Sequence, residues 1–181
     1  MKKTLLLILT ITLTACAGNP NAVTVTFDDE KSNAIRSHYE NYLNNDMDGL
    51  KSLLSSDLQV FLNSTEAITT DELVVLLQAQ HATFDPITMS WGGENENQDI
   101  GQWVETTNYP AGPANDAVTV TQTWFNWNAT SKLTGETINL PAHISFIWND
   151  DGKIAQEFHN YDTSEMTAAI EAAQAAAISS E

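Results

Sequence analysis

The side chains best placed for chemistry fall on the hairpin predicted over 138–162. Its turn allows two registers that differ by one residue. A two-residue Asp151–Gly152 turn would put Trp148 opposite Ala155 and Phe146 opposite Glu157, whereas the other register has a type I turn with Gly152 in the left-handed conformation. We favour the second, because it gathers the apolar residues on one face. That register pairs Asn149 with Lys153, Trp148 with Ile154, Phe146 with Gln156 and Ile144 with Phe158. Asn160 and Asp162 then end the apolar face, as the mouth of a pocket or as the rim of the sheet.

The same register places two histidines on the opposite, polar face. His143 lies across from His159, with Glu157 diagonal to the pair. Imidazole and carboxylate groups at this spacing can bind a divalent metal. A polar outer face or a subunit interface fits them better, because Glu157 does not face the pair. We therefore predict no metal and no cofactor, with a homodimer through this face as an alternative. His38 and His81 are interpreted as ordinary residues of helix surfaces.

The single cysteine, Cys16, follows a stretch typical of a secretory leader. Lys2 and Lys3 precede an apolar run of about ten residues, too short for a membrane-spanning helix, which needs about 20. The residues at 13–15 resemble a bacterial lipobox, in which cleavage occurs before the cysteine and the cysteine carries lipid. Ala17 replaces the aspartate that tends to retain such proteins at the inner membrane, so we predict a lipid anchor in the outer membrane, facing the periplasm. The alternative is an ordinary signal peptide with an incidental cysteine.

The chain is strongly acidic. Its 24 Asp and Glu residues against 7 Lys and Arg give a net charge of −17 over 181 residues. Such a surface repels phosphate backbones and anionic headgroups. We therefore predict no nucleic-acid partner, and contact with a membrane through the lipid alone. The length suits one domain with a substantial core.

Helical signals come first along the chain. Asp28–Asp29 offers N-cap residues for a first helix, and a second, short helix is expected to end near 55–57. Thr69 and Glu72 form a capping box that opens a third helix. The residues expected to face the core are Ile35, Tyr39, Tyr42 and Leu43, then Leu50, Leu53 and Leu54, then Leu73, Val74, Leu76 and Leu77.

Strand signals follow, because the hydrophobic period changes to two. Ile87, Met89 and Trp91 alternate with polar residues, and an acidic loop is predicted over 92–99. The predicted strands are 58–62, 100–109, 117–128, 138–149 and 153–162. The Ala-rich stretch over 164–178 predicts a frayed or loosely docked helix, with a partner-binding helix as the alternative. Helices followed by an antiparallel meander indicate an α+β fold, a cone in which a curved antiparallel sheet wraps over the N-terminal helices.

Three stretches in this order resemble one known superfamily. They are the helix pair Ile35–Leu54, the first strand beginning Asp57–Val60, and the closing hairpin Trp148–Asp162. Together they are similar to the nuclear transport factor 2-like superfamily, whose members include the SnoaL-like polyketide cyclases and ketosteroid isomerase. The resemblance spans roughly 32–166.

The resemblance implies a cone around a mostly apolar pocket, in which enzymatic members place an Asp, Tyr or His. It implies Asp162 as a general acid or base and Tyr39 as a hydroxyl that stabilises an oxyanion, with His38 equally close to that position. The catalytic aspartate of the isomerase would fall at Leu62 or Asn63, which cannot act as a base. Alternatively, Asp162 caps the C-terminal helix. The residues expected to bind a ligand are Tyr39, Trp91, Trp124, Phe158, Asn160 and Asp162.

We divide the chain into a leader over 1–15, a lipid anchor and tether over 16–29, a SnoaL-like cone domain over 30–163 and a C-terminal helix and tail over 164–181. The predicted function is binding of a small apolar molecule or a periplasmic partner in the cone, without catalysis. The alternative is a small-molecule isomerase, cyclase or hydrolase that uses Asp162 and Tyr39 for acid–base chemistry.

Overall fold

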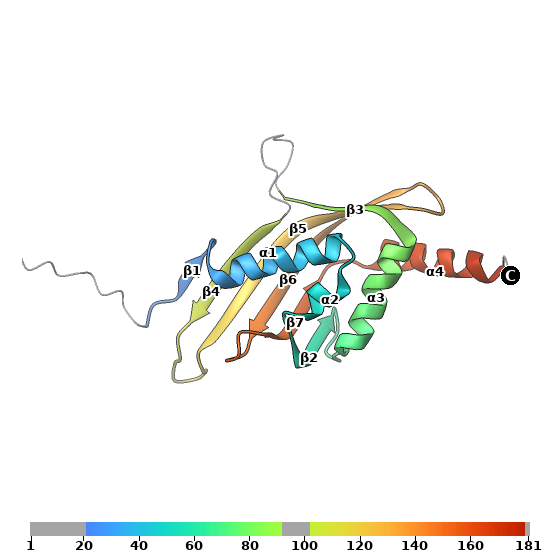
Figure 1. The fold of residues 1–181 in the computed structure, drawn as a ribbon. Helices are drawn as coiled ribbons and strands as arrows, with labels where there is room; N and C mark the ends of the chain where they lie inside the picture. Colours follow the sequence, from blue (N-terminus) through green and yellow to red (C-terminus); the bar gives the residue numbers. More distant parts are fainter. Residues whose placement is uncertain (1–20, 92–101, 180–181) are drawn as a thin grey trace, which may run out of the picture.

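The computed structural model describes residues 21–91 and 102–179 (Figure 1). Cys16 and the whole stretch predicted as an acidic loop, 92–99, lie outside the described residues. The helices are α1 (Glu30–Leu43), α2 (Met47–Lys51), α3 (Thr70–Thr83) and α4 (Ser164–Ser179). The strands are β1 (Thr24–Thr26), β2 (Leu54–Leu62), β3 (Phe84–Ser90), β4 (Trp103–Tyr109), β5 (Val118–Ser131), β6 (Thr137–Trp148) and β7 (Ile154–Asn160). Within the described part, no helix is long and apolar enough to cross a membrane.

The strands form one sheet in the order β1-β4-β5-β6-β7-β2, and β3 pairs with the half of the β5 edge that β4 leaves open. The pairs are antiparallel except for β2 and β7, which run parallel. Figure 1 shows α1 lying across one face of the curved sheet, with α2 and α3 following beyond its end. The predicted α+β class and the sheet wrapped over the N-terminal helices are confirmed.

Local signals fix the starts of the helices. The carboxylate of Asp29 accepts from the backbone N–H groups of Lys31 (2.9 Å) and Ser32 (3.1 Å), so α1 begins at Glu30. The predicted capping box at the start of α3 is present. Each cap satisfies backbone donors that have no partner within the helix.

The second helix is shorter than predicted. It ends at Lys51, and Leu54 already begins β2. The backbone carbonyl of Leu53 accepts from the N–H of Ile154 (3.0 Å), so pairing with β7 overrides helical propensity here. Long-range pairing of this kind leaves no local signal in the sequence.

Both ends of the domain are more ordered than the sequence predicts. Part of the predicted tether forms β1, which pairs antiparallel with β4. The C-terminal helix docks through its first turns: Met166 is buried in the core, and Ala169 and Ile170 pack against it. The prediction of a loosely docked helix is therefore wrong for these turns, because Met166 inserts beneath the sheet.

The last hairpin turns as predicted and then departs from the favoured register. The N–H of Asn149 donates to the carbonyl of Lys153 (2.9 Å), Gly152 has a φ of +71°, and Trp148 pairs with Ile154. A bulge then leaves Ala155 unpaired, because β6 continues with Ile147 opposite Gln156. A bulge adds one residue to one strand and shifts every later pair.

This bulge reverses the predicted faces of β7. Glu157 and His159 pair with Phe146 and Ile144 and point toward the core, so Trp148 and His159 share one side of the sheet. The predicted pairs Phe146–Gln156, Ile144–Phe158 and His143–His159 are therefore wrong. Two polar groups enter the interior where the sequence pattern predicted apolar ones.

Candidate functional site

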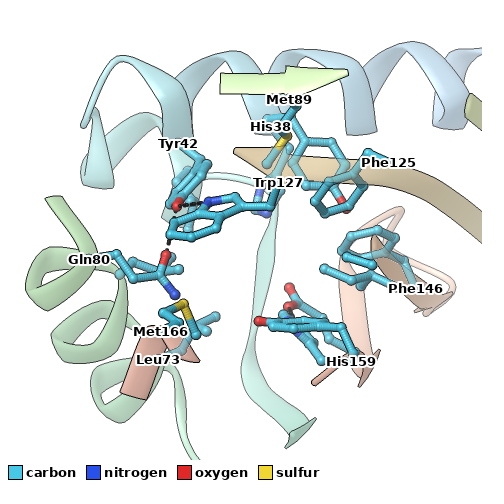
Figure 2. Close-up of a pocket in the computed structure, with 17 residues that line it drawn as sticks. His38, Tyr42, Leu73, Gln80, Met89, Phe125, Trp127, Phe146, His159 and Met166 are labelled. Carbon is cyan, nitrogen blue, oxygen red and sulfur yellow. Dashed lines mark hydrogen bonds and ion pairs between the residues drawn. The ribbon is translucent and has the colours of Figure 1, made fainter. Parts of the chain in front are cut away.

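An apolar cavity lies between the inner face of the sheet and helices α1, α3 and α4 (Figure 2). It contains about 570 Å³ of space between atoms when its open mouth is included, and the centres of water molecules can reach about 60 Å³ of it. The second volume is the one comparable with measured cavities, and it is several times the roughly 10–15 Å³ that one water molecule needs. Its lining residues are His38, Tyr39, Tyr42, Leu50, Leu73, Leu77, Gln80, Met89, Phe125, Trp127, Ala142, Ile144, Phe146, Glu157, His159, Tyr161 and Met166.

Aromatic rings form much of the wall. The rings of Tyr39 and Phe125 meet edge to face with centroids 5.3 Å apart, and Tyr39 meets Phe146 in the same way at 6.1 Å. Such packing fixes the rings relative to one another and adds to the stability gained from burial. The cavity therefore has a largely preformed shape.

At the α3 end, a chain of hydrogen bonds crosses the wall. The indole N–H of Trp127 donates to the Tyr42 hydroxyl (2.9 Å), which donates to Oε1 of Gln80 (2.6 Å). The direction is fixed, because an indole nitrogen can only donate and Tyr42 has one proton. Burial raises the pKa of Tyr42, so the hydroxyl stays protonated. Figure 2 shows Gln80 reaching in from α3 next to Met166. Because its Oε1 is the acceptor for Tyr42, its side-chain NH2 group is the part that can donate a hydrogen bond.

Tyr39 lines the cavity, but its proton is already engaged. Its hydroxyl lies 2.8 Å from Oγ1 of Thr123, which itself donates to the carbonyl of Ile144 (3.2 Å). Because Thr123 has one proton, the Tyr39 hydroxyl is the donor in the first contact. Burial raises the pKa of Tyr39 well above its ordinary value. The hydroxyl therefore offers a ligand lone pairs rather than the proton that an oxyanion needs.

The inward face of β7 supplies an acid and a base. Nε2 of His159 lies 2.8 Å from Oε2 of Glu157, and the two residues are only 8% and 2% exposed. A proton must lie between these atoms, because neither a bare carboxylate oxygen nor a bare ring nitrogen donates. Oε1 of Glu157 and Nδ1 of His159 have no partner among the described residues. Buried polar atoms without partners are uncommon and call for an explanation.

His38 completes the polar part of the cavity. The prediction of a surface position is wrong, because the residue is 6% exposed and lines the cavity wall. Burial lowers the pKa of His38, against a smaller rise from the charge of Glu157 and from a hydrogen bond to the backbone of Leu50. The ring is therefore neutral near pH 7, and its Nδ1 has no partner among the described residues.

Asp162 lies outside the cavity. Its Oδ1 accepts from the backbone N–H of Ser164 (2.9 Å), and hydrogen bonds with Ser164 lower the pKa of the exposed carboxyl. The alternative interpretation, a cap of the C-terminal helix, is confirmed. The prediction of Asp162 as the acid of the pocket is wrong, because the chain leaves the sheet before this residue.

The other predicted ligand-binding residues also lie away from the cavity; they are Trp91, Trp124, Phe158 and Asn160. Trp124 stacks on His143 on the outer face, with ring centroids 4.7 Å apart, and Phe158 stacks on Phe61 at 4.8 Å. The bulge in β7 explains the outward position of Phe158. Trp124 points outward because its neighbours on β5, Thr123 and Phe125, face the interior.

His143 and His159, the possible metal ligands of the predicted register, lie on opposite faces of the sheet, so they cannot share an ion. In residues 21–91 and 102–179, no three His, Cys, Asp or Glu side chains are arranged to hold a metal. The sequence did contain the signal for the true pair, since Glu157 and His159 are two residues apart on a strand and so share a face. No signal in the sequence predicted the bulge that turns this face of β7 inward.

The comparisons with known proteins identify the fold. No protein-family model and no curated protein sequence matches the chain. A nuclear transport factor 2-like protein of unknown function from Burkholderia pseudomallei is similar in structure, with a TM-score of 0.53, 14% identity and coverage of 79% of this chain and 98% of that one. IdmH from Streptomyces antibioticus, whose assignment as a polyketide cyclase is provisional, has a TM-score of 0.53, 14% identity and coverage of 79% and 99%. AclR from Streptomyces galilaeus, provisionally a hydroxylase, has a TM-score of 0.55, 11% identity and coverage of 78% and 96%. The chain therefore has the nuclear transport factor 2-like cone fold.

Proposed function

We propose that this protein binds a small, mostly apolar molecule in the cavity between the sheet and α1, α3 and α4. The observation that carries the proposal is an apolar cavity whose few polar atoms include buried ones without partners among the described residues. A ligand that supplies those partners recovers free energy that the empty cavity loses, while its apolar body gains from leaving water. The similarity to IdmH is consistent with a small-molecule site.

Acid–base catalysis in the same cavity is the second candidate. It is favoured by the buried contact between Glu157 and His159, which places a proton-accepting carboxylate beside an imidazole. Glu157 takes the role that Asp162 cannot fill, and His159 can hold or return the proton. This arrangement suits proton transfer at a carbon next to a carbonyl group.

We also propose that Cys16 carries lipid and holds the domain on the periplasmic side of the outer membrane. The leader and the small residues before Cys16 support this proposal. The cavity would then act on molecules within the periplasm.

Binding is tested by titrating the protein with toluene and benzyl alcohol while recording NMR chemical shifts of residues in the cavity wall. Ala142 lines the cavity, so Ala142→Leu should fill it and weaken binding at least tenfold. Ala172→Leu, on α4 away from the cavity, is the matched control and should bind as the parent does. If neither compound moves cavity resonances, or if Ala142→Leu binds as tightly as the parent, the binding proposal is wrong.

Catalysis is tested separately by following exchange of deuterium into the α-carbon of phenylacetone in D₂O. The second candidate predicts exchange above the buffer rate, lost in Glu157→Gln and retained in Asp162→Asn. Binding of benzyl alcohol to Glu157→Gln serves as the control for an intact cavity. If Glu157→Gln and the parent exchange deuterium equally, acid–base catalysis by Glu157 is ruled out and only the binding proposal remains.

A further inference from the structure

Three unpartnered polar atoms gather in the cavity wall. Four buried side-chain nitrogen or oxygen atoms lack a hydrogen-bond partner within the described residues, and three of them belong to residues that line the cavity: His38 Nδ1, Glu157 Oε1 and His159 Nδ1. Leaving such atoms unpaired costs stability, so their concentration at one site points to a ligand that pairs with them.

The polar atoms at this end of the cavity are mainly hydrogen-bond acceptors. Oε1 of Glu157 is a carboxylate oxygen with free lone pairs. Burial lowers the pKa of His38, so its ring is neutral and has one nitrogen without a proton. Nδ1, which has no partner among the described residues, is that nitrogen when the other one donates to the backbone of Leu50. The Tyr39 hydroxyl likewise offers lone pairs, because its proton points to Thr123. A matching ligand must therefore bring hydrogen-bond donors.

The surroundings favour a donor that carries positive charge. Among the described residues that line the cavity, none is Lys or Arg. The rings of Tyr39, Phe125, Phe146 and Trp127 present aromatic surface to the same space, and aromatic faces attract cations. The net charge of −17 also draws cations toward the protein and repels anions.

A metal ion does not fit this arrangement, although two imidazoles and a carboxylate are familiar metal ligands. In the described part of the chain no three such side chains come together with the geometry to hold one. An organic cation is less demanding, because its N–H groups can reach acceptors in different directions while its apolar body contacts the rings.

We infer that the ligand of this cavity is a small organic ammonium, whose N–H groups donate to Glu157 and His38 and whose apolar body packs against the aromatic wall. This inference rests on the proposed binding function and narrows it to one chemical class. Figure 2 shows the space in question, with His38, Phe125, Phe146 and His159 around it.

The test uses four probes with one ring and different head groups: benzylamine, benzyl alcohol, toluene and benzoate. Binding to the full-length protein is measured by calorimetry and NMR at pH 7. A hydrogen bond to a buried charged group corresponds to roughly a tenfold to hundredfold change in affinity. We therefore expect benzylamine to bind at least tenfold more tightly than benzyl alcohol, and benzoate to bind more weakly than toluene.

Two variants locate the effect. Glu157→Gln should reduce the preference for benzylamine over benzyl alcohol to about twofold or less, while leaving toluene binding within about twofold. Glu136→Gln removes the same charge from an exposed site and should keep the full preference, which separates a local contact from the field of the whole protein. Circular dichroism and unfolding curves show whether each variant is folded.

The outcomes separate this inference from the proposed function. If toluene and benzyl alcohol bind but benzylamine has no advantage, the ammonium inference is wrong and the binding function stands. If Glu136→Gln loses the preference as much as Glu157→Gln, the local contact is wrong. If His38→Phe abolishes the advantage while Glu157→Gln does not, the cation is not held by the carboxylate. If none of the four probes binds, the inference falls together with the proposed function.

Discussion

The two tyrosines of the cavity wall offer a sharp test of the hydrogen-bond directions. Tyr39 and Tyr42 are each 5% exposed, and replacing either with Phe removes one oxygen atom. In Tyr42→Phe, the indole N–H of Trp127 and Oε1 of Gln80 both lose their partner. A buried polar group left unpaired costs about 1–3 kcal/mol, so we expect a loss of about 2–4 kcal/mol in the free energy of unfolding.

Tyr39→Phe should cost less. Thr123 keeps its donation to the carbonyl of Ile144, so the substitution leaves only an unused lone pair, worth about 1 kcal/mol. The assay is urea unfolding followed by tryptophan fluorescence and circular dichroism. The slope of the unfolding free energy against urea concentration should be the same in both variants and the parent, so that the midpoints report stability. In thermal scans the difference should appear as several degrees, since about 1 kcal/mol shifts Tm by about 2–4 °C at this size. Equal losses in the two variants, or a larger loss in Tyr39→Phe, would refute the assigned directions.

Four further outcomes follow from particular residues. Asp29→Ala should cost about 1–2 kcal/mol at pH 7, because the residue caps α1. Its pKa is lowered from 3.8 to about 2, so its contribution is present above pH 4 and fades as the pH falls toward 2; unfolding curves at pH 7 and 2.5 should show the gap closing. Asp162→Asn should leave toluene affinity unchanged in NMR titrations, and a loss of binding would return Asp162 to the site. Gly152→Ala should lower stability by about 1 kcal/mol in urea, because φ is +71°, and no loss would contradict the left-handed turn. Cys16→Ala should abolish incorporation of labelled palmitate in a bacterial host, whereas an unlabelled parent would exclude the lipid anchor.

The elements predicted well are those whose signals are local. The starts of α1 and α3 are indicated by the carboxylate of Asp29 and by the Thr69–Glu72 capping box, because a cap acts within one turn of helix. The left-handed Gly152 is equally local, and the turn forms as predicted. The order of these elements was enough to predict the cone.

The site was harder to predict, because its residues depend on pairings across the sheet. Glu157 and His159 face outward in the favoured register, and the bulge at Ala155 turns them inward, which produces the Phe146–Glu157 pair of the alternative register. His38 looked like a surface residue because its place under the sheet depends on how α1 docks. Asp162, by contrast, follows the capping rule that the sequence already allowed. Whether a polar residue is buried depends on tertiary packing, which the periodicity of a single strand does not predict.

The unpaired residue at Ala155 has an evolutionary consequence. Deleting Ala155 would give a regular ladder that keeps Glu157 opposite Phe146 and His159 opposite Ile144, so a strand one residue shorter would hold the same pair inside. If Ala155 were kept and paired without a bulge, Gln156 would face Phe146, and Glu157 and His159 would turn to the other side of the sheet. The inward polar pair is thus compatible with two lengths of β7, and an alignment that misplaces the one-residue gap at Ala155 compares side chains from opposite faces of the sheet.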